Sequence, residues 1–345
     1  MPASRRTFLT GLSAVALAPL IGSCGEDVPA AAGRSREAEE AAFPATIRHK
    51  YGTTEVTKAP QRVVCVGLVE QDALLALGIV PVAVSHWFGK APGRIFPWAV
   101  DRLGDADLPV VLESADGVPI EKVAEQAPDL IIGLYAGMTK AEYDLLSEFA
   151  PTVAQPEGYV DYGAPWDEST LIVGQAVGQP AAAQALVDDV NALVEGYRSD
   201  HPEFEGRQAL AATLWEGIYV YGPDDPRSRM LTSLGFSYPS EFEDVGGDEF
   251  GGSISPERAK ELDLDCVVWI ATEQQVDQVT GGLWSETTAD AEGRAVYVNA
   301  SDGPYYIGHS MVTPLSIPWM LERYVPQLAA AVDGDPASVP PEPTA

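Results

Sequence analysis

Bulky aromatic residues and a pair of arginines follow the short apolar runs of this sequence, and their chemistry suits the binding of a large ligand. The apolar runs span residues 80–84, 130–132, 210–214, 219–221 and 296–298. At or soon after their ends come Trp87, Tyr135, Trp215, Tyr221, Arg227, Arg229, Tyr305 and Tyr306. Aromatic faces supply apolar area, and a guanidinium group supplies paired donors to oxygen atoms. We therefore take these residues as candidate ligand contacts.

Covalent catalysis and metal chemistry find little support in the residue pattern. The stretch 308–312 resembles a nucleophile elbow around Ser310, but Val312 occupies the second glycine position and no histidine follows His309. The four histidines stand far apart in the sequence, and it contains no zinc spacing, P-loop or dinucleotide-binding motif. The pattern favours binding over catalysis and predicts neither a catalytic residue nor a metal site.

The N-terminus carries a targeting signal. Ser4–Leu9 contains the arginine pair of a twin-arginine export signal, an apolar run follows, and a lipobox-like sequence ends at Cys24. The apolar run is too short to span a bilayer. We predict a signal peptide over 1–23, a lipid on Cys24 and a flexible tether over 24–45. That lipid would hold the protein on the extracytoplasmic face of the cell membrane, whereas a cleaved secretory peptide is the alternative.

The charge and the length of the chain limit what it can be. Asp and Glu number 51 against 21 for Lys and Arg, which gives a net charge of −30 over 345 residues. Such a chain does not bind nucleic acid through a general basic surface, because phosphate neutralisation needs many cations. The length exceeds what one hydrophobic core usually supports, so we expect two lobes.

Short apolar strands alternate with helical stretches on both sides of a long amphipathic segment near the middle of the chain. Strands separated by helices are typical of parallel sheets covered on both faces. An internal similarity supports two equivalent lobes, since Glu121 and Glu257 each open a short helix that an apolar strand follows. The resulting boundaries are an N-terminal lobe at 46–165, one interlobe helix at 166–200, a C-terminal lobe at 201–332 and a polar tail at 333–345.

Several of these segments resemble the class III periplasmic binding proteins for ferric siderophores. The similarity is carried by residues 63–67, 74–82, 121–132, 146–153 and 254–257, and residues 87–89 with 96–99 are similar to actinobacterial members. The resemblance implies a bilobed α/β fold with two parallel-sheet lobes joined by one long helix. It also implies the ligand-binding subunit of an ABC importer, which captures a ferric siderophore in the interlobe cleft. Such a protein is not an enzyme, has no cofactor, and holds iron only within its ligand.

The resemblance implies a protein partner as well. Members of this family present one acidic residue per lobe to arginines of the ABC permease, and Glu121 and Glu257 lie in matching segments. We therefore expect these two residues to dock the protein, as a monomer, on its permease. Each is also explained as an acid at a helix start, where the helix dipole favours a carboxylate.

Two other functions stay open at this stage. A haem- or corrinoid-binding relative would use the same cleft, with His86, Tyr135 or Tyr305 available as an axial ligand to haem. A surface-anchored enzyme acting on a siderophore would need a catalytic constellation that the sequence does not offer. Cys65 and Cys266 are expected as buried strand cysteines in separate lobes, although the oxidising exterior of the cell also permits a disulfide.

Overall fold

The computed structural model describes residues 42–86, 90–114, 117–247, 249–299, 303–335 and 337–338. Every described residue belongs to one compact unit, which spans Ser35–Ala345. The predicted signal peptide, Cys24, Trp87 and most of the predicted tether lie outside the described residues.

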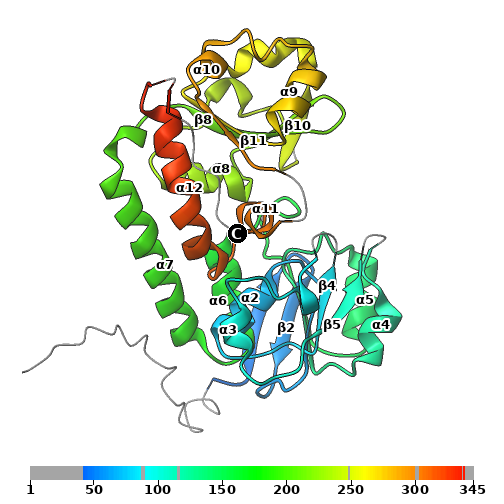
Figure 1. Cartoon of the computed structure of the whole chain (residues 1–345). Coiled ribbons are helices and arrows are strands. Elements are labelled where there is room, and N and C mark those ends of the chain that lie inside the picture. Colours follow the sequence, from blue (N-terminus) through cyan, green and yellow to red (C-terminus); the bar gives the residue numbers. More distant parts are fainter. Residues whose placement is uncertain are drawn as a thin grey trace, which may run out of the picture. The chain divides into compact units, whose positions relative to one another are not determined.

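The N-terminal lobe is built on a five-stranded parallel sheet with the order β5-β4-β3-β6-β7 (Figure 1). Its strands are β3 (Val63–Cys65), β4 (Ala83–His86), β5 (Val110–Glu113), β6 (Leu130–Gly133) and β7 (Thr152–Ala154). The connecting helices are α2 (Glu70–Ala76), α3 (Val100–Leu103), α4 (Ile120–Glu125) and α5 (Lys140–Ser147), with a short 3-10 helix η1 (Pro92–Arg94). An antiparallel pair, β1 (Ala45–His49) and β2 (Gly52–Val56), precedes the sheet. Buried clusters lie on both faces of the sheet, which explains why its central strands β3 and β6 are apolar throughout.

The C-terminal lobe has a five-stranded mixed sheet with the order β10-β9-β8-β11-β12. Its strands are β8 (Ala209–Leu214), β9 (Ile218–Tyr221), β10 (Gly251–Ile254), β11 (Cys266–Ile270) and β12 (Ala295–Tyr297). Strand β9 runs antiparallel to both of its neighbours, so the prediction of a purely parallel sheet is wrong for this lobe. The reason is the connection: only residues 215–217 separate β8 from β9, which is room for a hairpin but not for a helical crossover.

Helices cover both faces of the C-terminal sheet. One face packs against α8 (Pro226–Ser233), α11 (Pro304–Ser310), α12 (Ser316–Val332) and the 3-10 helix η2 (Pro202–Phe204). The other face packs against α9 (Glu273–Thr280), α10 (Thr288–Ala291) and the 3-10 helices η3 (Ser240–Phe242) and η4 (Pro256–Leu262). Figure 1 shows α8 and α11 between this sheet and the N-terminal lobe, so the C-terminal lobe presents helices and strand ends to its neighbour.

Two helices occupy the segment 166–200, where the sequence predicted a single one. They are α6 (Trp166–Ala176) and α7 (Pro180–Asp200). Gly178 separates them because its φ of +73° lies in the left-handed region, which a continuing helix does not adopt. Pro180 then opens α7 at the first helical position, where its missing N–H costs no hydrogen bond.

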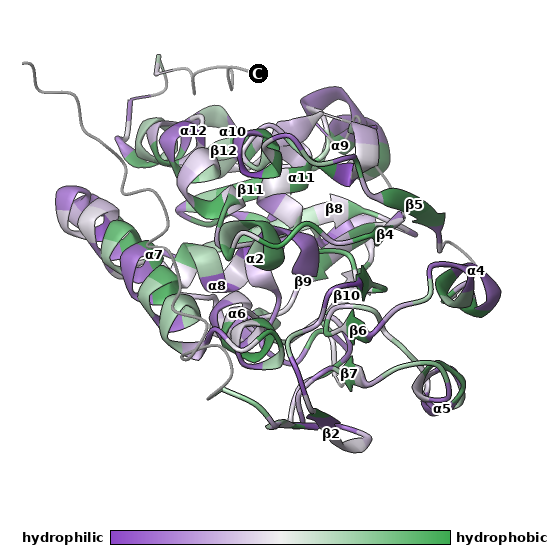
Figure 2. Cartoon of the chain, turned by 90° about the horizontal axis from the view of Figure 1, so that it is seen from below, coloured by the Kyte–Doolittle hydropathy of each residue, from purple (hydrophilic) through white to green (hydrophobic). Residues whose placement is uncertain are grey.

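Helix α7 is the element that joins the lobes. Ala183 near its start belongs to the buried core of the N-terminal lobe, whereas Val190 and Val194 belong to the core of the C-terminal lobe. Figure 2 shows a hydrophobic stripe along one side of α7 and a hydrophilic surface on the other. The bilobed α/β fold with a helical connector is therefore confirmed, with α7 as the connector.

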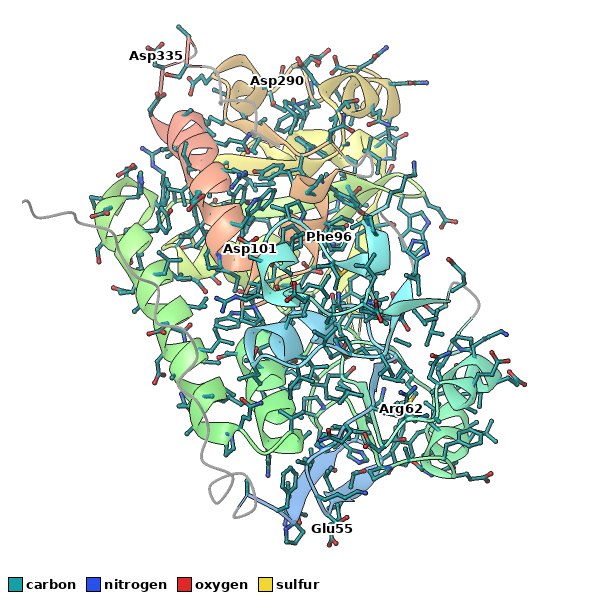
Figure 3. The ribbon with its side chains drawn as sticks, turned by 60° about the horizontal axis from the view of Figure 1, so that its bottom comes forward. Glu55, Arg62, Phe96, Asp101, Asp290 and Asp335 are labelled. Atoms are coloured by element: carbon teal, nitrogen blue, oxygen red, sulfur yellow. The ribbon has the colours of Figure 1, made fainter. Side chains whose placement is uncertain are left out.

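Direct contacts also tie the lobes together beside α2. The Asp72 carboxylate accepts hydrogen bonds from Trp98 Nε1 at 2.7 Å and from Thr313 Oγ1, which lies just before α12, at 2.6 Å. The ring of Trp98 lies 5.1 Å from that of Phe96 and 5.2 Å from that of Trp319 in α12, between ring centroids. Figure 3 accordingly places Phe96 in the middle of the described unit, with Glu55 and Asp290 toward opposite ends.

The two described cysteines sit in equivalent places. Cys65 lies in β3 and Cys266 in β11, and both are free and fully buried. Because they belong to different sheets, they lie in separate lobes as the sequence predicted. No helix in the described part of the chain is both long and apolar enough to cross a bilayer.

Candidate functional site

A series of aromatic rings links the two lobes. Tyr135, two residues after the end of β6, has its ring centroid 5.1 Å from that of Tyr162. The Tyr162 centroid lies 6.4 Å from that of Phe250 in the C-terminal lobe. The Phe250 ring lies 5.9 Å from Tyr219, and Tyr219 lies 5.4 Å from Tyr221. We call these residues, Tyr135, Tyr162, Tyr219, Tyr221 and Phe250, the aromatic cluster. These rings meet edge to face or at a tilt, with interplanar angles between 50° and 82°, and a ligand held between the lobes could contact their faces and edges.

The backbone makes room for these rings. Tyr219 and Tyr221 are two residues apart in β9, so both side chains point to the same face of the sheet. A Cβ atom at Gly251 would lie 2.7 Å from the Tyr219 ring and 2.5 Å from the Val220 carbonyl oxygen, so the position requires glycine. In the N-terminal lobe, the Tyr162 hydroxyl donates a hydrogen bond to the Ala136 carbonyl at 3.2 Å. The cluster is therefore held by strand pairing on one side and by a loop contact on the other.

A buried carboxylate positions Tyr135. Glu70, at the start of α2 and only 2% exposed, accepts hydrogen bonds through Oε1 from the backbone N–H groups of Leu134 and Tyr135, at 2.5 and 2.7 Å. Burial raises the pKa of Glu70, while these backbone hydrogen bonds act against that shift. The interaction fixes the loop that follows β6 and with it the direction of the Tyr135 ring.

An ion pair is buried beside the aromatic cluster. Arg227 Nη1 donates to both carboxylate oxygens of Asp225, at 3.0 and 2.9 Å, and the guanidinium carbon lies 4.0 Å from the Tyr221 ring centroid. The Arg227 side chain is 9% exposed and that of Asp225 is 2% exposed. Burial acts to lower the pKa of Arg227, but the adjacent carboxylate outweighs it and holds that pKa above its ordinary value. Arg227 is thus a charged group whose charge is already balanced within the protein.

Two buried donors at this place have no protein acceptor within the described residues. They are the Tyr219 hydroxyl and Arg227 Nε. As whole residues, Tyr219 is 5% exposed and Arg227 is 8% exposed. A buried donor without an acceptor costs about 1–3 kcal/mol, so such groups are usually satisfied by water or by a ligand. Both lie next to Tyr221, which is 5.4 Å from Tyr219 and 4.0 Å from the guanidinium carbon of Arg227.

A cavity of about 280 Å³ lies beside Tyr135, between the lobes and against helices α6 and α7. Its lining includes Glu70, Tyr135, Trp166, Asn191, Arg229 and Thr313. Arg229 spans this region: Nη1 donates to the Gly163 carbonyl at 2.5 Å, and Nη2 donates to Asp224 at 2.8 Å. Trp166 also lies partly buried against the core of the C-terminal lobe.

The other predicted contacts are distributed more widely. Trp215 follows β8, is 61% exposed, and has its ring 5.6 Å from that of Tyr219, so it extends the aromatic cluster to the surface. Tyr305 is only 8% exposed, and its hydroxyl donates to Gln327 of α12 at 2.5 Å, which places it in the core of the C-terminal lobe. Tyr306 is partly buried against the same core and lies close enough to Tyr221 to affect its pKa. Trp87 is outside the described residues.

The predicted docking residues are both exposed. Glu121 lies in the first turn of α4 and Glu257 in the first turn of η4, one in each lobe. Ser255 Oγ donates a hydrogen bond to the Glu257 carboxylate. Both carboxylates are therefore available to a partner at the surface.

The serine and the histidines considered for catalysis or metal binding are either buried or hydrogen-bonded to a neighbouring side chain. Ser310 lies fully buried in α11, not on a strand-to-helix turn, so it does not form a nucleophile elbow. His86 is hydrogen-bonded to Glu113 and His201 to Glu203, while His309 is buried, which lowers its pKa to about 3. Within the described residues, no three His, Cys, Asp or Glu side chains are grouped so that they could hold a metal ion.

Several residues of the site were not among the predicted contacts. Tyr219 could have been found, because the alternation of Tyr219 and Tyr221 puts both on one strand face. Asp225 could have been suspected as a partner for an arginine two residues away. Tyr162 and Phe250 lie in loops whose sequence carries no periodic signal, so only the tertiary structure reveals that they join the cluster.

Comparison with known proteins agrees with this geometry. A family model described as "Periplasmic binding protein" matches residues 63–306. The probable siderophore-binding lipoprotein YfiY of Bacillus subtilis (strain 168) is 27% identical over 267 residues, which cover 72% of this chain and 78% of that protein.

Solved structures give the same result over more of the chain. A periplasmic solute binding protein from Mycobacterium smegmatis is 33% identical, with a TM-score of 0.72, over 84% of this chain and 98% of that one. PiaA of Streptococcus pneumoniae TIGR4, solved in complex with ferrichrome, is 25% identical with a TM-score of 0.74 over 84% and 99% of the two chains. With two sheets, a helical connector and a site between the lobes, this chain belongs to the periplasmic binding protein family.

Proposed function

We propose that this protein is the extracytoplasmic ligand-binding subunit of an ABC importer and that it captures a ferric siderophore between its two lobes. The observation that carries the proposal is the aromatic cluster, which takes residues from both lobes. Within it the Tyr219 hydroxyl, and beside it Arg227 Nε, are buried donors with no acceptor among the described residues. Ferric siderophores combine a large apolar surface with exposed oxygen atoms. The aromatic rings can pack against the apolar surface, and the Tyr219 hydroxyl and Arg227 Nε can donate hydrogen bonds to the oxygen atoms.

The relatives support the same ligand class. YfiY is named as a probable siderophore-binding lipoprotein, and PiaA was solved with ferrichrome. As both are similar to this chain over most of its length, the proposal extends their ligand class to it. It includes no catalytic step and no resident cofactor, since iron enters only as part of the ligand.

Fluorescence titration tests the proposal. The chain contains 7 tryptophans, and Trp215 lies exposed at the edge of the aromatic cluster. Binding of a ferric siderophore should quench their emission saturably at concentrations below about 1 µM, an affinity of roughly 8 kcal/mol. Haem and cobalamin belong in the same panel. Saturable quenching by one of these, with none by any iron chelate, would contradict the proposal.

A variant identifies the binding place in the same assay. Replacement Tyr219→Phe removes the hydroxyl without an acceptor but keeps the ring, and it should weaken binding by about threefold to thirtyfold. The matched control is Tyr143→Phe, a tyrosine of α5 that contacts His49 and Tyr51 and lies outside the aromatic cluster. Equal losses for both variants would place the ligand elsewhere.

Docking on a permease is the second part of the proposal. Glu121 and Glu257 are exposed, one per lobe, which suits a partner that contacts both lobes at once. The double variant Glu121→Ala, Glu257→Ala should bind siderophore as the parent does but reduce its uptake by whole cells. Such surface charges set orientation and encounter rate more than stability. Unchanged uptake at low siderophore concentration would rule out this docking role.

Membrane attachment through Cys24 completes the proposal. The twin arginines, apolar run and lipobox-like sequence occur in the order that such export requires. The variant Cys24→Ala should leave the membrane fraction and appear in soluble form, whereas Arg5→Lys with Arg6→Lys should prevent export. Membrane retention of the Cys24→Ala protein would contradict the lipid anchor.

A further inference from the structure

The charged side chains around the candidate site neutralise one another. The loop after β9 and the first turn of α8 contain Asp224, Asp225, Arg227 and Arg229, two acids and two bases. Arg227 pairs with Asp225 at 2.9 Å and Arg229 pairs with Asp224 at 2.8 Å. The segment therefore adds no net positive charge to the site.

Cations from other elements are engaged as well. Lys50 forms an ion pair with Asp161 at 2.5 Å, near Tyr162. Arg94 is 6% exposed, with its guanidinium carbon 4.9 Å from the Phe96 ring centroid, in a separate crevice lined by Gln71 and Met311. The internal positions outside the described residues, 87–89, 115–116, 248, 300–302 and 336, contain no lysine or arginine at all. They cannot add a cation to the site.

An exposed carboxylate instead lies beside the aromatic cluster. Glu249 is exposed next to Phe250, and both Glu249 and Asp225 lie close enough to Tyr219 to raise its pKa further, after burial as the main cause. The whole chain adds a net charge of −30. A negative potential of this kind repels anions as they approach and gives them no countercharge once they are bound.

We infer that the site selects ferric chelates without net negative charge, the hydroxamate class in particular, a conclusion that rests on the proposed siderophore function. Three hydroxamates together carry the three negative charges that balance Fe³⁺, so the complex is neutral. Three catecholates carry twice that charge and leave the complex trianionic. A neutral complex can fill an aromatic site and accept hydrogen bonds from Tyr219 and Arg227 Nε without needing a free cation.

The test compares chelates that differ in charge. Ferrichrome is neutral, ferrioxamine B carries one positive charge, and ferric enterobactin is trianionic. The first two should bind the purified protein more tightly than the third by about a hundredfold or more, because like-charge contact costs several kcal/mol. Raising the salt concentration should leave the ferrichrome affinity nearly constant while it reduces the discrimination against enterobactin.

Substitutions of exposed acidic residues test whether charge, and not ligand shape, causes the selection. Asp224→Asn removes the negative charge that is paired with Arg229, and Glu249→Gln removes a negative charge beside Phe250. Both should tighten enterobactin binding several-fold while they leave ferrichrome binding within about twofold. The control is Asp189→Asn on the exposed side of α7. Equal gains for both chelates, or for the control variant, would overturn the electrostatic basis of the selection.

The outcomes distinguish this inference from the function on which it rests. Tight binding of ferrichrome and weak binding of enterobactin supports both. Binding of enterobactin as tight as that of ferrichrome, or tighter, overturns the charge selection but leaves the siderophore function intact. If no ferric chelate binds, the proposed function fails, and the inference fails with it.

Discussion

At the scale of single residues, the buried ion pair between Asp225 and Arg227 should contribute to the stability of the fold. Removing one partner of a buried pair leaves an uncompensated charge, which costs about 3–5 kcal/mol. We expect Arg227→Gln to lower the free energy of unfolding by that amount in urea denaturation. The double variant Arg227→Gln, Asp225→Asn should recover part of the loss. A single variant within about 1 kcal/mol of the parent would show that the pair is solvated in solution.

Asp72 should make stability depend on pH in a direction opposite to that of most carboxylates. Burial raises its pKa from 3.8 to about 6, although the hydrogen bonds from Thr313 and Trp98 act against the shift. The folded protein therefore binds this proton more tightly than the unfolded chain does. The stabilisation is complete below about pH 4 and is lost as the pH rises to about 6, with an upper value of roughly 3 kcal/mol.

The variant Asp72→Asn isolates this contribution. It keeps an oxygen acceptor for Thr313 and Trp98 but cannot ionise. Relative to the parent, its free energy of unfolding should increase between about pH 4 and pH 7, as measured by urea denaturation at several pH values. A difference between the two proteins that stays constant over this range would contradict the assignment.

At the scale of elements, the crossing of α6 and α7 depends on one glycine. A Cβ atom at Gly174 would lie 2.2 Å from the Ala183 Cβ and 3.1 Å from the Gln179 carbonyl oxygen. Gly174→Ala should therefore push the helices apart and destabilise the fold by about 1–3 kcal/mol. The control is Gly196→Ala in α7, where a Cβ meets nothing within 4 Å. There we expect stabilisation of about 0.5–1 kcal/mol from helix propensity. Thermal unfolding of both variants checks the contrast.

The elements also show where sequence reasoning succeeds and where it stops. The alternation of strands and helices, and the similar settings of Glu121 and Glu257, predicted two lobes because both signals come from local periodicity. The sequence predicts one helix over 166–200 because amphipathic spacing continues across Gly178, although Pro180 is a residue type typical of a first helical position. The cluster contacts of Tyr162 and Phe250 arise from tertiary packing, which no local pattern encodes. The hairpin at 215–217, by contrast, could have been inferred from the short separation of the apolar runs 210–214 and 219–221.

At the scale of the whole unit, we expect little relative motion of the lobes on ligand binding. Helix α7, about 30 Å long from its residue count and the helical rise, contributes to the cores of both lobes. The contacts of Asp72 with Thr313 and of Arg229 with Gly163 add direct links between them. Small-angle scattering profiles of free and ligand-saturated protein should nearly superimpose. A clear fall in the radius of gyration would show that the connector bends.

Each lobe contains one buried cysteine, Cys65 or Cys266, whose reactivity can report the opening of the sheet around it. Burial raises the pKa of the Cys65 thiol, and it raises that of Cys266 to about 12. Since alkylating reagents attack the thiolate of an accessible cysteine, neither thiol reacts until its strand separates from the sheet. In a form without Cys24, the alkylation rate at each site, followed by mass spectrometry, measures the opening free energy of one lobe independently of the other. A ligand that bridges the lobes must slow both rates, whereas one held by a single lobe protects only its own cysteine.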